Sequence, residues 1–506
     1  MSAVIPRFHI VTFGCQMNVH DSQRMEESLH AHGWATAEGE HDADLIVFNT
    51  CSVREKAEHK LRSEVGRLRP VKRARPELVV AVAGCVAQQE GDKLLAAIPH
   101  IDIVVGPDNL HELAALVETS RLGGPPVART VFDVENPTFL GAQPSSGNTP
   151  VSAFVTTMKG CDERCSFCVV PYTRGPERYR PMDEIVAEVR RLVDSGVREV
   201  TLLGQTVNSW LPPDQVRARS HEGSHEPRPS LDDERSQFPE LLRAIAREVP
   251  QLGRLRYTSP HPRHVTPELV AAHAEVDVLA RHVHLPSQSG SDRMLRRMIR
   301  RYTRKELVER ASWLAAARPG MTLSTDIIIG FPGETDADFE ATLDMVREVG
   351  FTALFGFKFS PRPHTPALRL ADDVPESVKA ERLARLFSTV EIQQKAHLGS
   401  LVGTRVRVLF EGPSRPNESK GHAGGVVPST GAMRMMGRSE RNEIVHVDVP
   451  RGRDGHVLAG RFVDVAVASA NAHSLVGALD EADARALPEL ATPERAAVRL
   501  AILAQS

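Results

Sequence analysis

The stretch SAFVTTMKGCDERCSFCVVPYTRG, residues Ser152–Gly175, decides how the rest of the sequence is interpreted. It begins with a largely apolar run, Ser152–Met158, which is typical of a strand buried on both faces. Three cysteines follow almost at once, Cys161, Cys165 and Cys168, in the spacing C-x3-C-x2-C. The stretch therefore predicts a buried strand whose carboxyl end leads into a loop that carries three thiols.

The spacing of these thiols indicates a metal centre. Three thiolates so close together can hold three irons of a 4Fe–4S cluster and leave the fourth iron open to a ligand or substrate. A zinc site with a histidine as fourth ligand is the alternative, but no histidine lies near this stretch. A disulfide framework is not expected of six cysteines in a cytosolic chain of 506 residues.

The sequence after this stretch repeats the order strand then helix. Apolar runs recur in five places, and helical patterns separate them: Glu199–Leu203, Arg254–Thr258, His282–Leu285, Leu323–Ile329 and Ala353–Phe357. Such alternation predicts a partial (β/α) barrel over residues 147–385. The polar segment 212–236 interrupts it and is expected to be a disordered surface insertion.

The sequence before the stretch carries the other three cysteines. Cys15, Cys51 and Cys85 each come directly after a short apolar run, and helical patterns lie between these runs. This alternation predicts a doubly wound α/β domain over residues 6–122, with a fourth strand at 101–105. Ligands of such sheets lie beyond the carboxyl ends of the strands, so the three cysteines are expected to converge. A single free cysteine can equally be a small buried apolar residue.

The C-terminal part predicts a third domain. Residues 404–411, 443–449 and 460–467 alternate as strands do, so a small antiparallel β-barrel is expected over 398–478. An Ala-rich helical tail, 479–506, follows. The chain is α/β overall, its net charge is only −3, and its longest apolar run is too short to span a membrane.

The quoted stretch resembles the signature of radical S-adenosylmethionine (SAM) enzymes, down to the aromatic Phe167 before the last cysteine. Further segments resemble the methylthiotransferase branch of that family. They are Val169–Gly175, Leu203–Gln205, Ser259–Pro262, His284–Ser291 and Asp326–Glu334.

This resemblance implies two 4Fe–4S clusters and SAM as cofactors. Cys161, Cys165 and Cys168 would hold the cluster whose open iron binds SAM, with Gly204, Gln288 and Gly330 at the SAM site. A further set of thiols would hold an auxiliary cluster that presents the inserted sulfur, namely Cys15, Cys51 and Cys85. The enzyme would use two SAM molecules, one to methylate the sulfur and one to form the radical that activates the substrate carbon.

The segments Gly14–Asn18 and Asn49–Ala57 resemble the branch that acts on N(6)-dimethylallyl (isopentenyl) adenosine. Insertion of a methylthio group at carbon 2 of that base, at position 37 of tRNA, is the implied activity. Two alternative substrates are threonylcarbamoyl-adenosine in tRNA and a ribosomal-protein aspartate, and a non-enzymatic two-cluster electron carrier is a third possibility. Pro176 and Tyr179 depart from the family pattern.

The implied partners are the tRNA anticodon arm and an electron donor such as flavodoxin or ferredoxin, with no membrane. Two basic runs, Arg54–Arg75 and Arg293–Lys305, are either solvated helix faces or phosphate contacts. The C-terminal barrel resembles the RNA-binding TRAM-like domain of RNA-modifying enzymes. A cytoplasmic monomer is expected.

Overall fold

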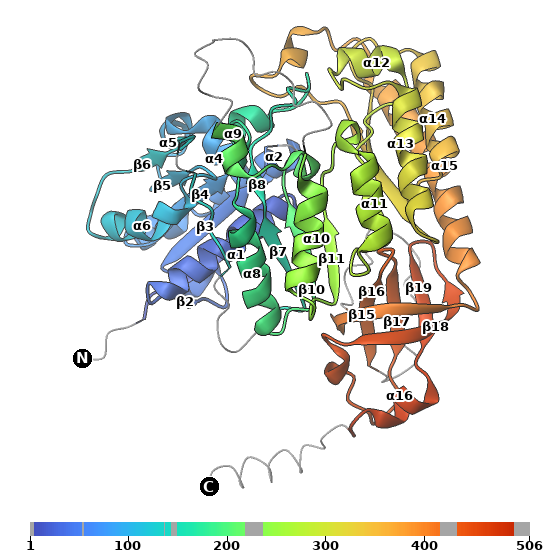
Figure 1. Ribbon diagram of the computed structural model, residues 1–506. Helices are drawn as coiled ribbons and strands as arrows, with labels where there is room; N and C mark the ends of the chain where they lie inside the picture. Colours follow the sequence, from blue (N-terminus) through green and yellow to red (C-terminus); the bar gives the residue numbers. More distant parts are fainter. Residues whose placement is uncertain are drawn as a thin grey trace, which may run out of the picture.

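A computed structural model describes residues 5–52, 55–135, 137–142, 149–217, 236–414 and 433–489. Three units follow one another along the chain (Figure 1). The N-terminal unit, blue and cyan, lies beside the green first half of a central unit, and the red C-terminal barrel lies below the lower end of the long helix α15 (Glu376–Ser400). Among the described residues, no helix combines the length and the hydropathy needed to cross a bilayer.

The N-terminal unit is built on one parallel sheet with the strand order β2-β1-β3-β4-β5-β6. Its central strands, β3 and β4, are buried along their whole length, as the uninterrupted apolar runs predict. The bounds are β1 Arg7–Phe13, β2 Ala35–Thr36, β3 Leu45–Thr50, β4 Val79–Gly84, β5 Ile103–Val105 and β6 Val127–Arg129. The edge strands β2 and β6 are additional to the four that the sequence predicts.

Helices cover both faces of this sheet, so the predicted doubly wound fold is confirmed. One apolar core lies under α1 (Gln16–Ala31) and α6 (Leu113–Arg121). The opposite core receives side chains from four helices. Their bounds are α2 Glu55–Arg67, α3 Arg69–Ala74, α4 Cys85–Glu90 and α5 Asp92–Ala97. The two faces are therefore closed, and the carboxyl edge of the sheet is left for a site.

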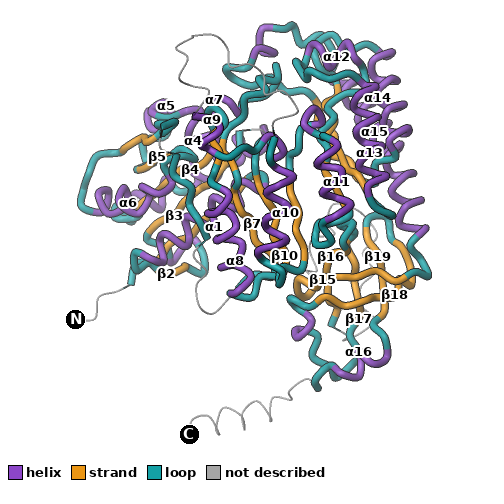
Figure 2. Tube along the Cα trace, viewed as in Figure 1, coloured by secondary structure: helices purple, strands orange, loops and turns teal. Residues whose placement is uncertain are grey.

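The central unit is a partial barrel made of two three-stranded parallel sheets, ordered β11-β10-β7 and β12-β13-β14. In Figure 2 the purple helices of this unit cover its orange strands. Its bounds are β7 Ser152–Thr156, β10 Glu199–Leu203, β11 Arg254–Tyr257, β12 His282–His284, β13 Thr322–Ile329 and β14 Ala353–Lys358. These are the six strands that the sequence predicts. The helices packed outside are α8 Met182–Asp194, α10 Phe238–Glu248, α11 Pro267–Glu275, α13 Arg304–Ala317, α14 Asp336–Val349 and α15.

Shorter elements surround the barrel. They are β8 Met158–Lys159, α7 Val170–Thr173, β9 Arg178–Tyr179, α9 Pro213–Arg217 and α12 Asp292–Arg297. Helix α9 lies inside the segment 212–236, which the sequence predicts to be a disordered insertion. Ser236 is also ordered, because its hydroxyl donates to the carbonyl of Asn208 at 2.7 Å. Residues 218–235 lie outside the described ranges.

The C-terminal unit is a closed five-stranded barrel in the order β15-β16-β17-β19-β18. Its bounds are β15 Arg405–Pro413, β16 Arg434–Ser439, β17 Ile444–Asp448, β18 Phe462–Ala470 and β19 Ser474–Ala478. The barrel was expected to be antiparallel throughout, but β17 and β19 pair in parallel because β19 closes the sheet next to β17 rather than following it. Of the expected helical tail, α16 (Glu481–Ala486) is described and residues 490–506 lie outside the described ranges.

This barrel docks against the amino ends of the central strands. The guanidinium of Arg256 donates to the carbonyl of Ser439 at 2.8 Å, and Arg254 donates to that of Arg438 at 3.1 Å. Phe462 lies against Arg254, with the guanidinium carbon 5.0 Å from the ring centre. The carboxyl ends of the strands, where ligands of such barrels bind, are thereby left open.

Candidate functional site

The first three cysteines converge at the carboxyl edge of the N-terminal sheet. Cys15 caps α1, Cys51 follows β3, and Cys85 begins α4 directly after β4. A hydrogen bond with Cys51 lowers the pKa of the Cys15 thiol to about 6, with help from the charge of Arg174. Burial raises the pKa of the Cys85 thiol, although the positive charge of the same arginine acts to lower it. The thiols of Cys15 and Cys85 therefore lie near one guanidinium, and Cys51 contacts Cys15.

Two buried asparagines support this cysteine group, and sequence reasoning gave them no role. The thiol of Cys15 donates to the Asn18 side chain at 3.3 Å, and the Asn18 amide donates to Asn49 at 3.0 Å. Asn49 in turn donates to the carbonyl of Asn18 at 2.8 Å. Gly84, at φ 91°, brings β4 so close that an added Cβ would lie 2.7 Å from the carbonyl oxygen of Thr50. The loop geometry is thus fixed by hydrogen bonds and close packing.

The second three cysteines lie in the loop after β8. Cys161 makes a hydrogen bond of 3.1 Å with the hydroxyl of Thr206, and the amide of Cys168 donates to the carbonyl of Cys165 at 3.0 Å. Burial raises the pKa of Cys161, and burial together with the neighbouring Cys165 raises that of Cys168 to about 12. Neutral thiols crowded in this way suit a bound cation, since metal binding is what deprotonates a coordinating thiol.

Arg300 reaches this loop from the turn after α12. Its Nη1 donates to the sulfur of Cys165 at 3.3 Å, while Nε donates to the hydroxyl of Tyr302 at 3.0 Å. The residues on either side, Ile299 and Arg301, both have positive φ, 57° and 54°. Positive φ is a genuine outlier for a β-branched residue, and such strain gathers at functional sites. The turn therefore holds the guanidinium against a candidate cluster ligand.

A buried carboxylate with two imidazoles holds the same loop from another side. Glu163, His261 and His264 offer ligand atoms within 4.8 Å of one another. His264 is 2.9 Å from the Glu163 carboxylate, and this bond keeps the pKa of Glu163 low although burial alone would raise it. The Nδ1 of His261 accepts from the amide of Arg263 at 3.2 Å, so the proton of this ring is on Nε2, facing Glu163. Because Nε2 of His261 carries the proton, it has no lone pair to offer a metal ion in this tautomer. The three side chains are therefore interpreted as a network that positions the cysteine loop.

The three residues expected at the SAM site lie at strand ends. An added Cβ at Gly204, after β10, would lie 2.7 Å from the Met158 side chain. Gln288 has a positive φ of 69°, and its backbone bridges to β13 through Asp326 and Ile328. Gly330 ends β13 at φ 70°, where the side chain of Lys379 fills the space beside it. The positions agree with a site at the carboxyl ends, and packing alone also accounts for both glycines.

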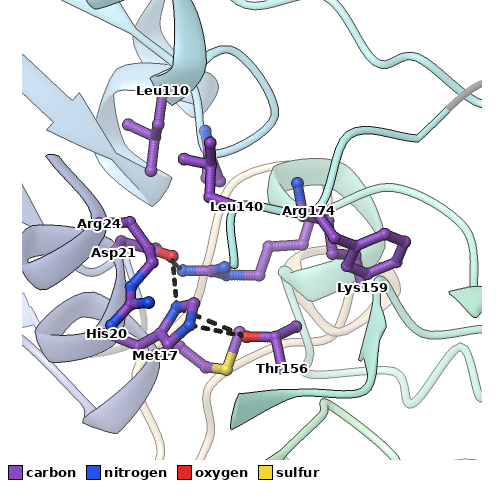
Figure 3. Close-up of a pocket in the computed structure, with 11 residues that line it drawn as sticks. Met17, His20, Asp21, Arg24, Leu110, Leu140, Thr156, Lys159 and Arg174 are labelled. Atoms are coloured by element: carbon purple, nitrogen blue, oxygen red, sulfur yellow. Dashed lines mark hydrogen bonds and ion pairs between the residues drawn. The ribbon is translucent and has the colours of Figure 1, made fainter. Parts of the chain in front are cut away.

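Beside the cysteine groups, charged and polar side chains of the N-terminal and central units form a buried set (Figure 3). Arg174, at the end of α7, donates to Asp21 of α1 at 2.6 Å. Both side chains are less than one-tenth exposed. His20 contacts Thr156 of β7, and Lys159 pairs with Asp108 at 3.3 Å. A cavity of about 20 Å³, with room for about one water molecule, lies between the N-terminal and central units, and its lining includes Arg174, Asp21, His20, Thr156 and Lys159.

Glu177 is a buried carboxyl of the central unit, and it predicts a pH effect on stability. Burial, then the charge of Asp162, raises its pKa to about 7, while Tyr179 and Ser209 donate hydrogen bonds to it. Tyr179, one of the two departures from the family pattern, is thus a partner of this carboxyl.

The folded protein keeps the Glu177 proton over a range in which the unfolded chain has lost it, between pH 4.5 and about 7. Stability should therefore fall as pH rises through this window, by about 3 kcal/mol for the full shift. The Glu177→Gln variant should lack this slope. Thermal unfolding of cluster-free wild type and variant between pH 5 and pH 8 measures it, and parallel pH profiles would contradict the expectation.

The basic runs contribute less free charge than the sequence suggests. In Arg293–Lys305, Arg293 pairs with Asp338, Arg297 donates to a carbonyl, and Arg300 is buried. The exposed members are Arg293, Arg296, Arg297, Arg301 and Lys305, of which the first and third make the contacts just named. In Arg54–Arg75, ion pairs engage several of the described basic side chains, namely Arg62, Arg67, Lys72 and Arg75. Much of each run thus serves the fold.

Comparison with known proteins gives two family matches. Residues 7–106 match "Uncharacterized protein family UPF0004", and residues 155–346 match "Radical SAM superfamily". The second match covers the cysteine loop and most of the partial barrel, so the fold and the loop together define a radical SAM protein.

Curated relatives match over nearly the whole chain. A tRNA-2-methylthio-N(6)-dimethylallyladenosine synthase of Sorangium cellulosum is 59% identical over 94% of this chain and 94% of its own length. One of Burkholderia thailandensis is 42% identical over 94% and 97%. The chain belongs to the family of tRNA-2-methylthio-N(6)-dimethylallyladenosine synthases. Among solved structures, the radical SAM methyltransferase TsrM of Kitasatospora setae has a TM-score of 0.49 at 16% identity, over 72% of this chain and 74% of that one.

Proposed function

We propose that this protein inserts a methylthio group at carbon 2 of N(6)-dimethylallyl (isopentenyl) adenosine at position 37 of tRNA. The observation that carries the proposal is the pair of three-cysteine groups, each at strand ends and facing each other across Arg174 and Asp21. Relatives that bear this activity in their names match over 94% of the chain. A sulfur source and a radical source side by side are what such a reaction requires.

Each cysteine group fits the metal centre proposed for it. Cys161, Cys165 and Cys168 would hold the 4Fe–4S cluster that binds SAM, and Arg300 would donate an N–H···S hydrogen bond to it. The other thiols would hold the auxiliary cluster beside Arg174, namely Cys15, Cys51 and Cys85. When bound, the first cluster supplies the electron that cleaves SAM, and the second presents the sulfur. The chain positions both and buries the space between them.

We assign one role to each domain. Residues 6–122 hold the auxiliary cluster, residues 147–385 form the radical SAM domain, and residues 398–478 form an RNA-binding barrel. SAM would lie along the carboxyl ends near Gly204, Gln288 and Gly330. The tRNA anticodon arm would meet the exposed side chains of Arg296, Arg301 and Lys305, and the target base would flip out to reach the barrel interior. The protein would act as a cytoplasmic monomer, with flavodoxin or ferredoxin as electron donor.

Methylthiolation of a defined tRNA tests the activity. Reconstituted protein with SAM, a reductant and prenylated tRNA should release 5′-deoxyadenosine and yield the methylthio nucleoside, measured by mass spectrometry. The same tRNA without the prenyl group is the matched control and should stay unmodified. Modification of threonylcarbamoyl-tRNA or of the ribosomal-protein aspartate instead would assign a different substrate, and no 5′-deoxyadenosine at all would indicate an electron carrier.

A further inference from the structure

The inner face of the sheet β12-β13-β14 carries two exposed aromatic rings. Phe355 is 55% exposed and Phe357 is 38% exposed, although both lie within a strand of the central barrel. Their neighbours Leu354 and Gly356 face the helices, because Leu354 packs into the main core and Gly356 lies against Leu383 of α15. Alternation along the strand therefore turns the two phenylalanines toward the barrel interior.

Polar groups share that inner face. Val283, Leu285, Leu323 and Ile327 belong to the main core, so His284 and Asp326 point the opposite way. Asp326 pairs across the sheet with Phe355, and its carboxylate is 3.3 Å from Nε2 of His284. The His284 ring meets Phe355 edge to face, with the ring centres 5.8 Å apart. Nδ1 of His284 is 2.9 Å from the hydroxyl of Ser324.

This surface is continuous with the candidate SAM site. The backbone of Gln288 bridges to β13 at Asp326 and at Ile328, the residue paired with Phe357. Phe167 of the cysteine loop and Ile328 pack against the same small apolar cluster. An occupant of the aromatic surface would therefore lie beside the cysteine loop.

We propose that Phe355 and Phe357, together with Asp326, form the surface that binds the flipped, prenylated adenine base. Every base presents a π-face that stacks on aromatic side chains. The dimethylallyl group is apolar and would be removed from water against the second ring. N6 of the prenylated adenine keeps one N–H, which the Asp326 carboxylate can accept. A surface of two rings with a carboxylate held by His284 thus suits an N(6)-alkylated purine, and the inference rests on the proposed function.

The test measures how well the protein distinguishes two RNAs. Reconstituted holoenzyme with SAM and no reductant would be titrated with an anticodon stem-loop RNA that carries either the prenylated or the unprenylated adenosine. Phe355→Ala should weaken binding of the prenylated RNA about tenfold, as loss of one stacking contact does, and reduce its preference over the unprenylated RNA. Phe355→Leu keeps the apolar bulk without the aromatic face. Its affinity for the prenylated RNA is expected to lie between those of wild type and Phe355→Ala.

Phe387→Ala is the matched control, because Phe387 is 44% exposed but lies on α15, outside the sheet. It should leave both affinities unchanged. Circular dichroism would establish that each variant is folded. Suppose that wild type methylthiolates the prenylated stem-loop, while Phe355→Ala and Phe357→Ala still prefer the prenylated over the unprenylated RNA as strongly as wild type does. The inference is then overturned and the proposed function stands. If wild type does not modify that stem-loop, the proposed function falls first.

Discussion

Replacing Cys161, Cys165 and Cys168 together by alanine should lower the iron content of anaerobically reconstituted protein from about eight to about four atoms per chain. The reason is geometric. The two cysteine groups come from different units, one at the carboxyl edge of the N-terminal sheet and one in the loop after β8. Each has its own supporting hydrogen bonds, from Asn18 and from Arg300. One group should therefore still hold its cluster when the other is removed.

The complementary variant sharpens this expectation. Replacing Cys15, Cys51 and Cys85 should also leave about four irons, but with the opposite effect on chemistry. SAM cleavage to 5′-deoxyadenosine should continue, while methylthiolation is lost, because the sulfur-presenting group is gone. Wild type with about four irons, all lost with Cys161, Cys165 and Cys168, would mean that the first group holds no cluster. Iron analysis and product analysis on the same preparations separate the two cases.

The core strands could be predicted from the sequence because they are buried on both faces and read as continuous apolar runs. Among the strands of the partial barrel, β10 is buried along its whole length, whereas β14 exposes Phe355 and Phe357 on one face. The strands that sequence reasoning missed are short or mixed in pattern, namely β2, β6, β9, β16 and β19. Val127–Arg129 becomes a strand only because β5 lies beside it. Such pairing is a tertiary effect that local pattern does not contain.

The cysteines could be predicted, but the residues that hold them in place could not. Cysteine spacing carries its own chemistry, whereas Arg174 and Arg300 look like ordinary members of a loop and a basic run. The run Arg293–Lys305 predicts either a solvated helix face or phosphate contacts, yet its member Arg300 is buried against Cys165. Nothing in the run Arg293–Lys305 distinguishes the inward arginines from the outward ones. That distinction depends on the positive-φ turn at residues 299–301, which no local sequence signal marks.

Replacing Arg174 by methionine should destabilise the protein by about 3–5 kcal/mol, the usual cost of removing one partner from a buried ion pair. The Arg174 and Asp21 side chains are 6% and 9% exposed, so water cannot compensate the carboxylate that remains. The free energy of unfolding in urea measures this loss. Arg347→Met is the matched control, because Arg347 pairs with Asp344 at 2.9 Å with both side chains more than half exposed. That exposed pair should contribute at most about 1 kcal/mol.

The double variant Asp21→Asn with Arg174→Met distinguishes charge from packing. If the loss comes from an uncompensated carboxylate, removing its charge should restore much of the stability, and the double-mutant cycle should give a large coupling energy. If the two losses simply add, the pair does not hold the units together. Asp21 belongs to α1 and Arg174 to the segment after the second cysteine group, so the coupling measures how firmly the two candidate clusters face each other. Sulfur presented by one group can reach a base activated by the other only if that contact is kept.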